Sequence, residues 1–259
     1  MRIKIILFIF TLGLITSAQS QNKHGIAKYG IFVDVNSGIQ QSGNFDFKSN
    51  NSPGQNLLGL VIKEGTFSEF FFGTGEIGLE SSILLKNRLL LSGKFNMANS
   101  LFNSDSRLED IYIRGTWKGR GCAMGIGYGV LTNEDEKPFL FRMSISLGSY
   151  KSHWKFSNQD INSVNFGNVK IKPSTSESFF SNNYYLDFNL NVADIKFLRK
   201  QTAKSCINTG LSLGYRQSIN AGNWIWENNN EVVQNINRTV MMGFYFKISV
   251  GLGYISKYE

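Results

Sequence analysis

The segment from residue 239 to residue 254, TVMMGFYFKISVGLGY, alternates between two kinds of side chain. Every second residue from Val240 to Tyr254 is apolar, and the residues between them are mostly small or polar. A period of two residues is typical of a β-strand with two unlike faces. At about 3.3 Å per residue the strand would be roughly 50 Å long, which exceeds the usual strand of a soluble protein. Its apolar side therefore requires a deep apolar environment.

The same alternation recurs along the chain, and no helical periodicity of comparable strength is found. Seven further segments alternate in this way: 28–35, 76–83, 89–97, 124–130, 139–148, 184–192 and 207–216. With the C-terminal segment, these predict eight strands. Two other segments, Leu108–Gly119 and Asn56–Lys63, also have the pattern of strands. The first is either a strand extension above a membrane or part of an extra strand pair, so a ten-strand barrel is an alternative.

The connections between the eight predicted strands alternate in length. Those around 86–88, 133–138 and 199–204 are short, whereas those at about 39–69, 103–120, 157–180 and 220–237 are long and polar. An up-and-down barrel in an outer membrane has this arrangement, with tight periplasmic turns and long outer loops. The predicted fold is therefore an all-β, antiparallel transmembrane β-barrel.

The composition of the two strand faces indicates which one meets lipid. In a soluble barrel the apolar face fills the core and the other face meets water. Here the second face is rich in Gly, Ser and Asn with single charges, which suits a crowded lumen. Tyr29, Tyr128, Phe139 and Tyr254 lie on the apolar face near the predicted periplasmic ends, as in an aromatic girdle. The apolar face is predicted to meet lipid, with a secreted soluble barrel as the alternative.

The N-terminus has the pattern of a secretory signal peptide. Two basic residues precede an apolar run from Ile5 to Ile15, and small residues follow up to Ala18. We expect residues 1–18 to be removed on export and residues 19–259 to form the barrel domain. Losing the two basic residues lowers the formal charge from +8 to +6, and the remaining basic residues are scattered, so no nucleic-acid partner is expected.

Charged residues also occur on the predicted inward face. An eight-strand barrel is only wide enough for its own side chains, so inward charges must be paired to be tolerated. Because both signs are present, we predict a salt-bridged lumen, with a narrow solute channel as the alternative. The predicted inward charges are Lys28, Asp34, Glu76, Glu80, Lys94, Arg142, Asp187, Arg216 and Lys247.

The first short hairpin predicts a specific register. Inward faces match across an antiparallel pair only when the paired residue numbers have an even sum. A three-residue turn centred on Asn87 meets this condition by pairing Leu85 with Leu89. It places Glu80 opposite Lys94, where we expect an ion pair. Asn87 is expected to supply the left-handed conformation that such a turn needs.

Signatures of catalysis, of a cofactor or of a metal site are not found. Two histidines cannot build a three-histidine zinc site. His153 and Ser157 would lie about 13 Å apart on one strand, which is too far for a base and its nucleophile. The His-x-Ser spacing of lipid A deacylase barrels is also absent, so we interpret His153 as a rim residue and keep a lipid hydrolase as the enzymatic alternative. Cys122 and Cys206 are expected at opposite rims, where no disulfide can join them.

Three segments of the chain resemble a known family. CAMGIGYGVLTNEDEKPFLFRMSISLGSY, CINTGLSLGYRQS and FKISVGLGYISKY are similar to the strand and turn units of small outer-membrane β-barrels of Gram-negative bacteria, the OmpA/OmpX-like eight-stranded type. The resemblance implies an outer-membrane location, contact with outer-membrane lipid and insertion by the outer-membrane assembly machinery. Such barrels commonly end on an aromatic residue, whereas here Glu259 follows Tyr258.

The function expected from these patterns is that of a non-enzymatic, monomeric barrel without a cofactor. It would serve envelope integrity or surface recognition through its outer loops. Trp117, Trp224 and Trp226 lie in or beside these loops and are candidates to bind an extracellular ligand, because exposed tryptophans are common binding anchors. Alternatively, the three rings rest at the lipid headgroups of the barrel rim.

Overall fold

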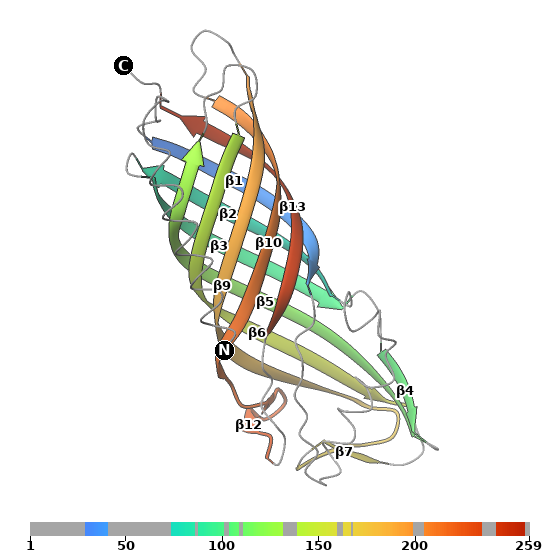
Figure 1. Ribbon diagram of the computed structural model, residues 1–259. Helices are drawn as coiled ribbons and strands as arrows, with labels where there is room; N and C mark the ends of the chain where they lie inside the picture. The colour runs from blue at the N-terminus through green and yellow to red at the C-terminus, as the bar shows by residue number, and fades with distance from the viewer. Residues whose placement is uncertain are drawn as a thin grey trace.

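The computed structural model describes ten stretches of the chain as strands, turns and short connections (Figure 1). No helix in these stretches is long and apolar enough to cross a lipid bilayer. The predicted signal peptide, the strand-like segment Asn56–Lys63 and the predicted lumen residue Lys28 lie outside the described residues. The described residues are 29–40, 74–85, 88–100, 104–108, 111–131, 139–159, 163–166, 168–198, 205–234 and 242–256.

Eight strands close into an antiparallel ring. They are β1 (Tyr29–Gln40), β2 (Thr74–Leu85), β3 (Leu89–Ser100), β5 (Ile111–Leu131), β6 (Phe139–Asn158), β9 (Ser176–Phe197), β10 (Ser205–Ala221) and β13 (Met242–Ile255). Each pairs with the next one along the chain, and β13 pairs with β1 to complete the ring. The predicted eight-strand barrel is confirmed, and the ten-strand alternative is wrong. Closure leaves none of these eight strands with an unpaired edge along the barrel wall.

The two faces of the ring are those predicted from the alternation. Outer side chains such as Met124, Phe244 and Leu252 have exposed fractions of 80%, 61% and 64%. The residues between them point inward, and many of these buried side chains are polar or charged. A soluble barrel would have the opposite distribution, with its apolar side chains inside.

The first hairpin has the predicted register but a different turn residue. β2 and β3 pair so that Glu80 lies opposite Lys94. The left-handed residue of the turn is Arg88, with φ of 62°, and its amide donates to the Leu85 carbonyl at 2.8 Å. The prediction for Asn87, which itself lies outside the described residues, is corrected to Arg88. In a three-residue hairpin the left-handed residue follows a type I turn and therefore comes last.

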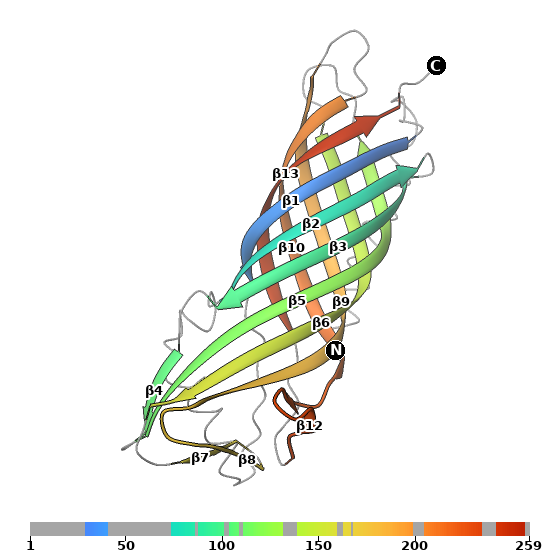
Figure 2. The same ribbon diagram turned by 180° about the vertical axis from the view of Figure 1, so that it is seen from behind.

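Three neighbouring strands continue beyond the rest of the barrel at one end (Figure 2). We call this end of the three strands the outer sheet; it consists of residues 111–120 of β5, 151–158 of β6 and 176–182 of β9. Short strands flank it, namely β4 (Ser104–Leu108) beside β5, β11 (Ile225–Trp226) beside β9, and β12 (Glu231–Val232) beside β11. Another short hairpin joins β7 (Val164–Phe166) and β8 (Val169–Ile171). Most of the predicted segment Leu108–Gly119 is thus a strand extension rather than an extra barrel pair.

The outer sheet distinguishes the two ends of the barrel. At the opposite end, which we call the short-turn end, the hairpins β2–β3, β5–β6 and β9–β10 turn back on themselves, and β13 ends there (Figure 1). The end with the outer sheet is the long-loop end. Long and short connections therefore separate to opposite ends, as the sequence predicted.

Both cysteines are free, which confirms the prediction. Cys206 is buried at the short-turn end, in a cluster that includes Phe32 and Ile255. Cys122 is exposed on the outer face of β5 and pairs with Phe95 of β3. The expected rim position of Cys122 is wrong: it lies within the barrel wall, because β5 begins at Ile111 and Cys122 pairs with the middle of β3.

Candidate functional site

The barrel interior contains a network of charged side chains from all around the ring. Eight of the nine predicted inward charges are described, and each has an exposed fraction of 9% or less. Four are acidic and four are basic, so their formal charges cancel. The eight are Asp34, Glu76, Glu80, Lys94, Arg142, Asp187, Arg216 and Lys247.

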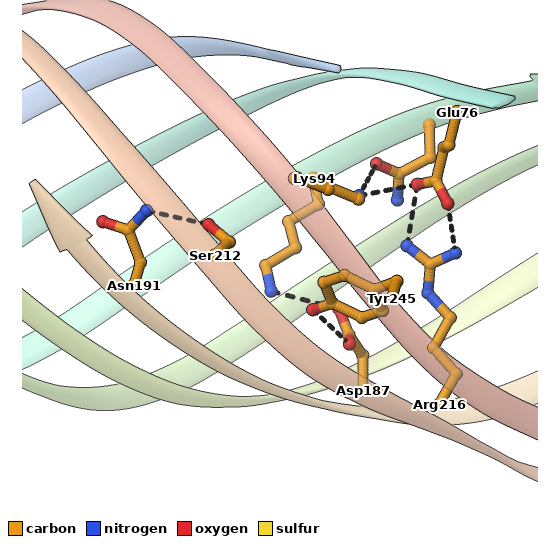
Figure 3. A network of polar contacts seen from close by, with 9 residues as sticks. Glu76, Lys94, Asp187, Asn191, Ser212, Arg216 and Tyr245 are labelled. Carbon is orange, nitrogen blue, oxygen red and sulfur yellow. Dashed lines mark hydrogen bonds and ion pairs between the residues drawn. The ribbon is translucent and has the colours of Figure 1, made fainter. Parts of the chain in front are cut away.

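Glu76 is the centre of the first part of this network (Figure 3). Arg216 binds it with two parallel hydrogen bonds, from Nη1 to Oε2 at 2.6 Å and from Nη2 to Oε1 at 2.8 Å. Lys247 Nζ donates to Glu76 Oε1 at 2.7 Å and to Asn96 Oδ1 at 3.2 Å. These residues come from β2, β3, β10 and β13, so the contacts join strands across the lumen. A two-pronged guanidinium–carboxylate contact is among the stronger polar interactions in proteins.

Asp187 on β9 is the centre of the second part (Figure 3). It accepts from Lys94 Nζ at 3.1 Å and from the Tyr245 hydroxyl at 2.8 Å. The expected ion pair between Lys94 and Glu80 does not form, although their backbones are paired. The long lysine side chain leaves its own hairpin and reaches a carboxylate across the lumen, which a two-strand register argument cannot foresee.

Arg142 on β6 forms the third part, closer to the short-turn end. Its guanidinium is 2.6 Å from Asp34 Oδ2 and donates to Asn191 Oδ1 at 2.8 and 3.0 Å. It also donates to Ser82 Oγ at 3.0 Å. Asn208 donates to the other oxygen of Asp34. In all three parts of the network, each donor lies on a different strand from its acceptor. These contacts therefore cross-link the strands of the barrel wall.

Apolar and aromatic side chains fill the lumen on both sides of the charges. At the short-turn end, one buried cluster comprises Phe32, Leu84, Leu90, Leu140, Ala193, Ile195, Cys206 and Ile255. Toward the long-loop end, Tyr150 and Tyr185 pack edge to face, with ring centroids 6.3 Å apart. They belong to a cluster with Ala98 and Ala123. The described lumen is therefore occupied by packed side chains along its length.

The concave face of the outer sheet carries a second hydrophobic core, which we call the outer cap. Trp154 stacks on Phe156 and packs edge-on against Trp224, with both centroid distances at 5.9 Å. Phe156 in turn contacts Phe179 at 5.9 Å. The hairpin residues Val169 and Ile171 and the loop residue Val233 are also buried. Segments from two long connections thus pack against the outer sheet instead of extending freely.

This arrangement corrects the expectation for the loop tryptophans. Trp224 is 1% exposed and is therefore a core residue of the outer cap, neither an exposed anchor nor a ring at the lipid headgroups. Trp226 is half-buried, and its indole N–H donates to Glu177 Oε2 at 2.7 Å. Trp117 pairs with Trp154 through the backbone, but its side chain lies outside the described set. Only Trp226 thus remains a described candidate for recognition.

His153 lies on the convex face of the outer sheet, as a rim residue would. Its Nε2 donates to Glu227 Oε2 at 2.9 Å, and this hydrogen bond lowers the pKa of the Glu227 carboxyl. Ser178 also hydrogen-bonds to Glu227, so both side chains contact the carboxylate. Hydrolysis by a serine needs the hydroxyl on the histidine, which this arrangement does not provide. The described residues contain no cluster of His, Cys, Asp and Glu that could hold a metal ion.

Sequence reasoning missed the neutral partners of the charges. Asn96, Asn191 and Asn208, the hydroxyl of Tyr245 and Ser212 take part in the hydrogen bonds of the lumen. All of them lie at inward positions in the strand alternation, so parity could have identified them as lumen residues. Which atoms they contact depends on the closed ring.

No protein-family model matches the sequence, and a search of curated proteins finds no similar chain. Among solved structures, the chain is similar to Ail, the attachment invasion locus protein of Yersinia pestis, with 12% identity, a TM-score of 0.37 and coverage of 89% of this chain and 99% of Ail. A major outer membrane protein from Thermus thermophilus has 11% identity and a TM-score of 0.40, with coverage of 88% and 98%. The outer membrane protease OmpT from Escherichia coli has 8% identity and a TM-score of 0.33, with coverage of 90% and 99%. Identities this low carry no information about individual residues or activity.

Proposed function

We propose that this chain is an integral outer-membrane β-barrel that neither conducts solutes nor catalyses a reaction. Its outer cap would serve surface recognition or envelope integrity. We expect a monomer that is exported by a cleaved signal peptide at residues 1–18 and inserted by the outer-membrane assembly machinery. The observation that carries the proposal is the closed ring with an apolar exterior and a filled, charge-balanced interior.

The exterior supports insertion in a lipid bilayer. A closed barrel satisfies all backbone hydrogen bonds within its wall, which is the condition for crossing hydrocarbon with strands. Tyr29 and Tyr254 stack on the outer face at the short-turn end, with centroids 6.3 Å apart, and Phe139 is exposed at the same end. Tyr184 is 54% exposed toward the long-loop end. Aromatic residues at both limits of an apolar belt are typical of membrane interfaces.

The interior supports the absence of conduction. A pore needs a continuous wet path, whereas here charged pairs, two tyrosines and an apolar cluster succeed one another along the lumen. A side chain such as Arg216, which is completely buried and bound to Glu76, cannot line an open channel. These contacts support a filled lumen over the channel alternative.

Conductance measurements in planar bilayers test the proposal. The purified, folded barrel should give no discrete current steps, while a porin added to the same bilayer should give them. Steps from the wild-type barrel would contradict the non-conducting role. Cell fractionation tests the location, and recovery of the chain in the periplasm or the medium would favour a secreted soluble barrel. For the enzymatic alternative, lipid mass spectra should be unchanged by His153→Ala.

A further inference from the structure

The convex face of the outer sheet carries basic residues side by side on neighbouring strands. Arg120 of β5 is paired with Lys151 of β6, and one step further out Lys118 is paired with His153. Lys155 follows on β6 and is exposed, as are Lys118, Arg120 and Lys151. We call Lys118, Arg120, Lys151 and Lys155 the basic patch.

The acidic side chains near the basic patch do not neutralise it. Like charges directly opposite each other destabilise a sheet, so cross-strand basic pairs require a counter-charge. Glu227 interacts electrostatically with Lys151, but its hydrogen bond goes to His153, and one carboxylate cannot balance four basic residues. Glu177 accepts from Trp226 and Asn228 instead. No ion pair to a residue of the patch occurs within the described part of the chain, which leaves its four charges for an external anion.

The height of the basic patch relative to the apolar belt identifies the kind of anion. The row of paired residues just below Arg120 and Lys151 contains Cys122 of β5 and Tyr184 of β9, and Phe95 of β3 is in the same row. One row lower, Met124 and Leu147 are 80% and 58% exposed. Alternate residues on one face of a strand are about 7 Å apart, so the basic residues begin within about one lipid headgroup of the apolar belt. Lipid phosphates lie at this height.

We propose that the basic patch binds the phosphate groups of a phosphorylated outer-leaflet lipid. Guanidinium and ammonium groups are the side chains that recognise phosphate, Arg through a fork of donors and Lys as a point charge. Lys151 is held in place over the Phe180 ring at 4.0 Å, so its charge is directed along the sheet surface. The inference rests on the proposed membrane location, because a soluble chain would not present this row to lipid.

The test compares lipids that differ in phosphate and variants that differ in charge. Folded protein in neutral detergent is titrated with bisphosphorylated lipid A or with lipid A from which both phosphates have been removed, and bound lipid is measured by native mass spectrometry. The patch variant is K118Q/R120Q/K151Q. The control variant, K170Q/K172Q/K196Q, also removes three exposed basic charges, none of which belongs to the patch. Inorganic phosphate serves as a competitor.

Each basic residue near an anionic surface contributes about a fivefold gain in binding, so the patch variant should lose at least about tenfold in affinity for the bisphosphorylated lipid. The wild type and the control variant should prefer this lipid to the dephosphorylated one, and added salt should weaken their binding. Millimolar inorganic phosphate should compete poorly if the site takes membrane lipid, while full competition would indicate a free-phosphate site and overturn the proposal.

Equal binding by the patch and control variants, or equal binding of the two lipids, would also overturn it. Heat-modifiable gel migration, recorded for every sample, separates this result from a failure of the proposed function. A wild type that does not show the shift is not a membrane barrel, and both proposals fall. A normal shift without phosphate preference removes only the lipid site.

Discussion

The ion pair between Lys94 and Asp187 offers a quantitative test of how the lumen is held together. Their Nζ and Oδ2 atoms are 3.1 Å apart, and the two side chains are 4% and 1% exposed. At this distance the attraction is about 5 kcal/mol for an effective dielectric constant of about 20. The cost of removing both charges from water offsets much of it. The net contribution of the pair to the free energy of unfolding is therefore small, but leaving either partner buried without the other is costly.

We expect Lys94→Met to lower the free energy of unfolding by about 3–4 kcal/mol, because Asp187 loses the one cation in direct contact with it and keeps only the Tyr245 hydroxyl as a direct hydrogen-bond donor. Adding Asp187→Leu should recover about 2–3 kcal/mol, since no unpaired charge then stays buried. The assay is urea unfolding in lipid vesicles, followed by tryptophan fluorescence. Lys155→Met is a control for loss of a lysine from an exposed site on the outer sheet.

A second double-mutant cycle, with Lys94→Met and Glu80→Leu, shows whether Glu80 or Asp187 is the partner of Lys94. Glu80 is paired with Lys94 through the backbone but not through an ion pair, so its coupling energy with Lys94→Met should stay below about 1 kcal/mol. Additive costs for Lys94 and Asp187, or a larger coupling with Glu80 than with Asp187, would refute the reasoning.

Two further predictions concern the barrel wall and the outer cap. A Cβ on Gly214 would overlap the ring of Tyr245, so Gly214→Ala should cost about 1–3 kcal/mol in urea unfolding, whereas Gly93→Ala, which meets no close contact, should leave the midpoint nearly unchanged. The pKa of Glu227 is lowered by its bond to His153, so the contact contributes stability above the unfolded-state pKa of about 4.3 and loses it as pH falls through the lower folded value. Tryptophan fluorescence of the cap should therefore change in that acid range in the wild type and be insensitive to it in Glu227→Gln; identical titrations would contradict this.

The strand alternation by itself determined most of the barrel. The period of two residues identified the eight strands and assigned their inward and outward faces, because it fixes on which face each side chain lies. The lengths of the connections then predicted that short and long ones lie at opposite ends. The same parity rule gave the register that places Glu80 opposite Lys94. The prediction of the left-handed turn residue was wrong. Conformational preference favoured Asn87, whereas a three-residue turn places the left-handed residue last, at Arg88.

Only the tertiary structure decided which inward charges meet. Lys94 reaches Asp187, and Glu76 binds Arg216 and Lys247, because the curvature of the ring brings distant strands within the length of a side chain. It likewise decided that Trp224 is buried, since the outer sheet supplies an apolar surface that no loop sequence reveals. Local periodicity determines on which face of a strand each side chain lies. Which side chains meet across the lumen depends on closure of the whole ring.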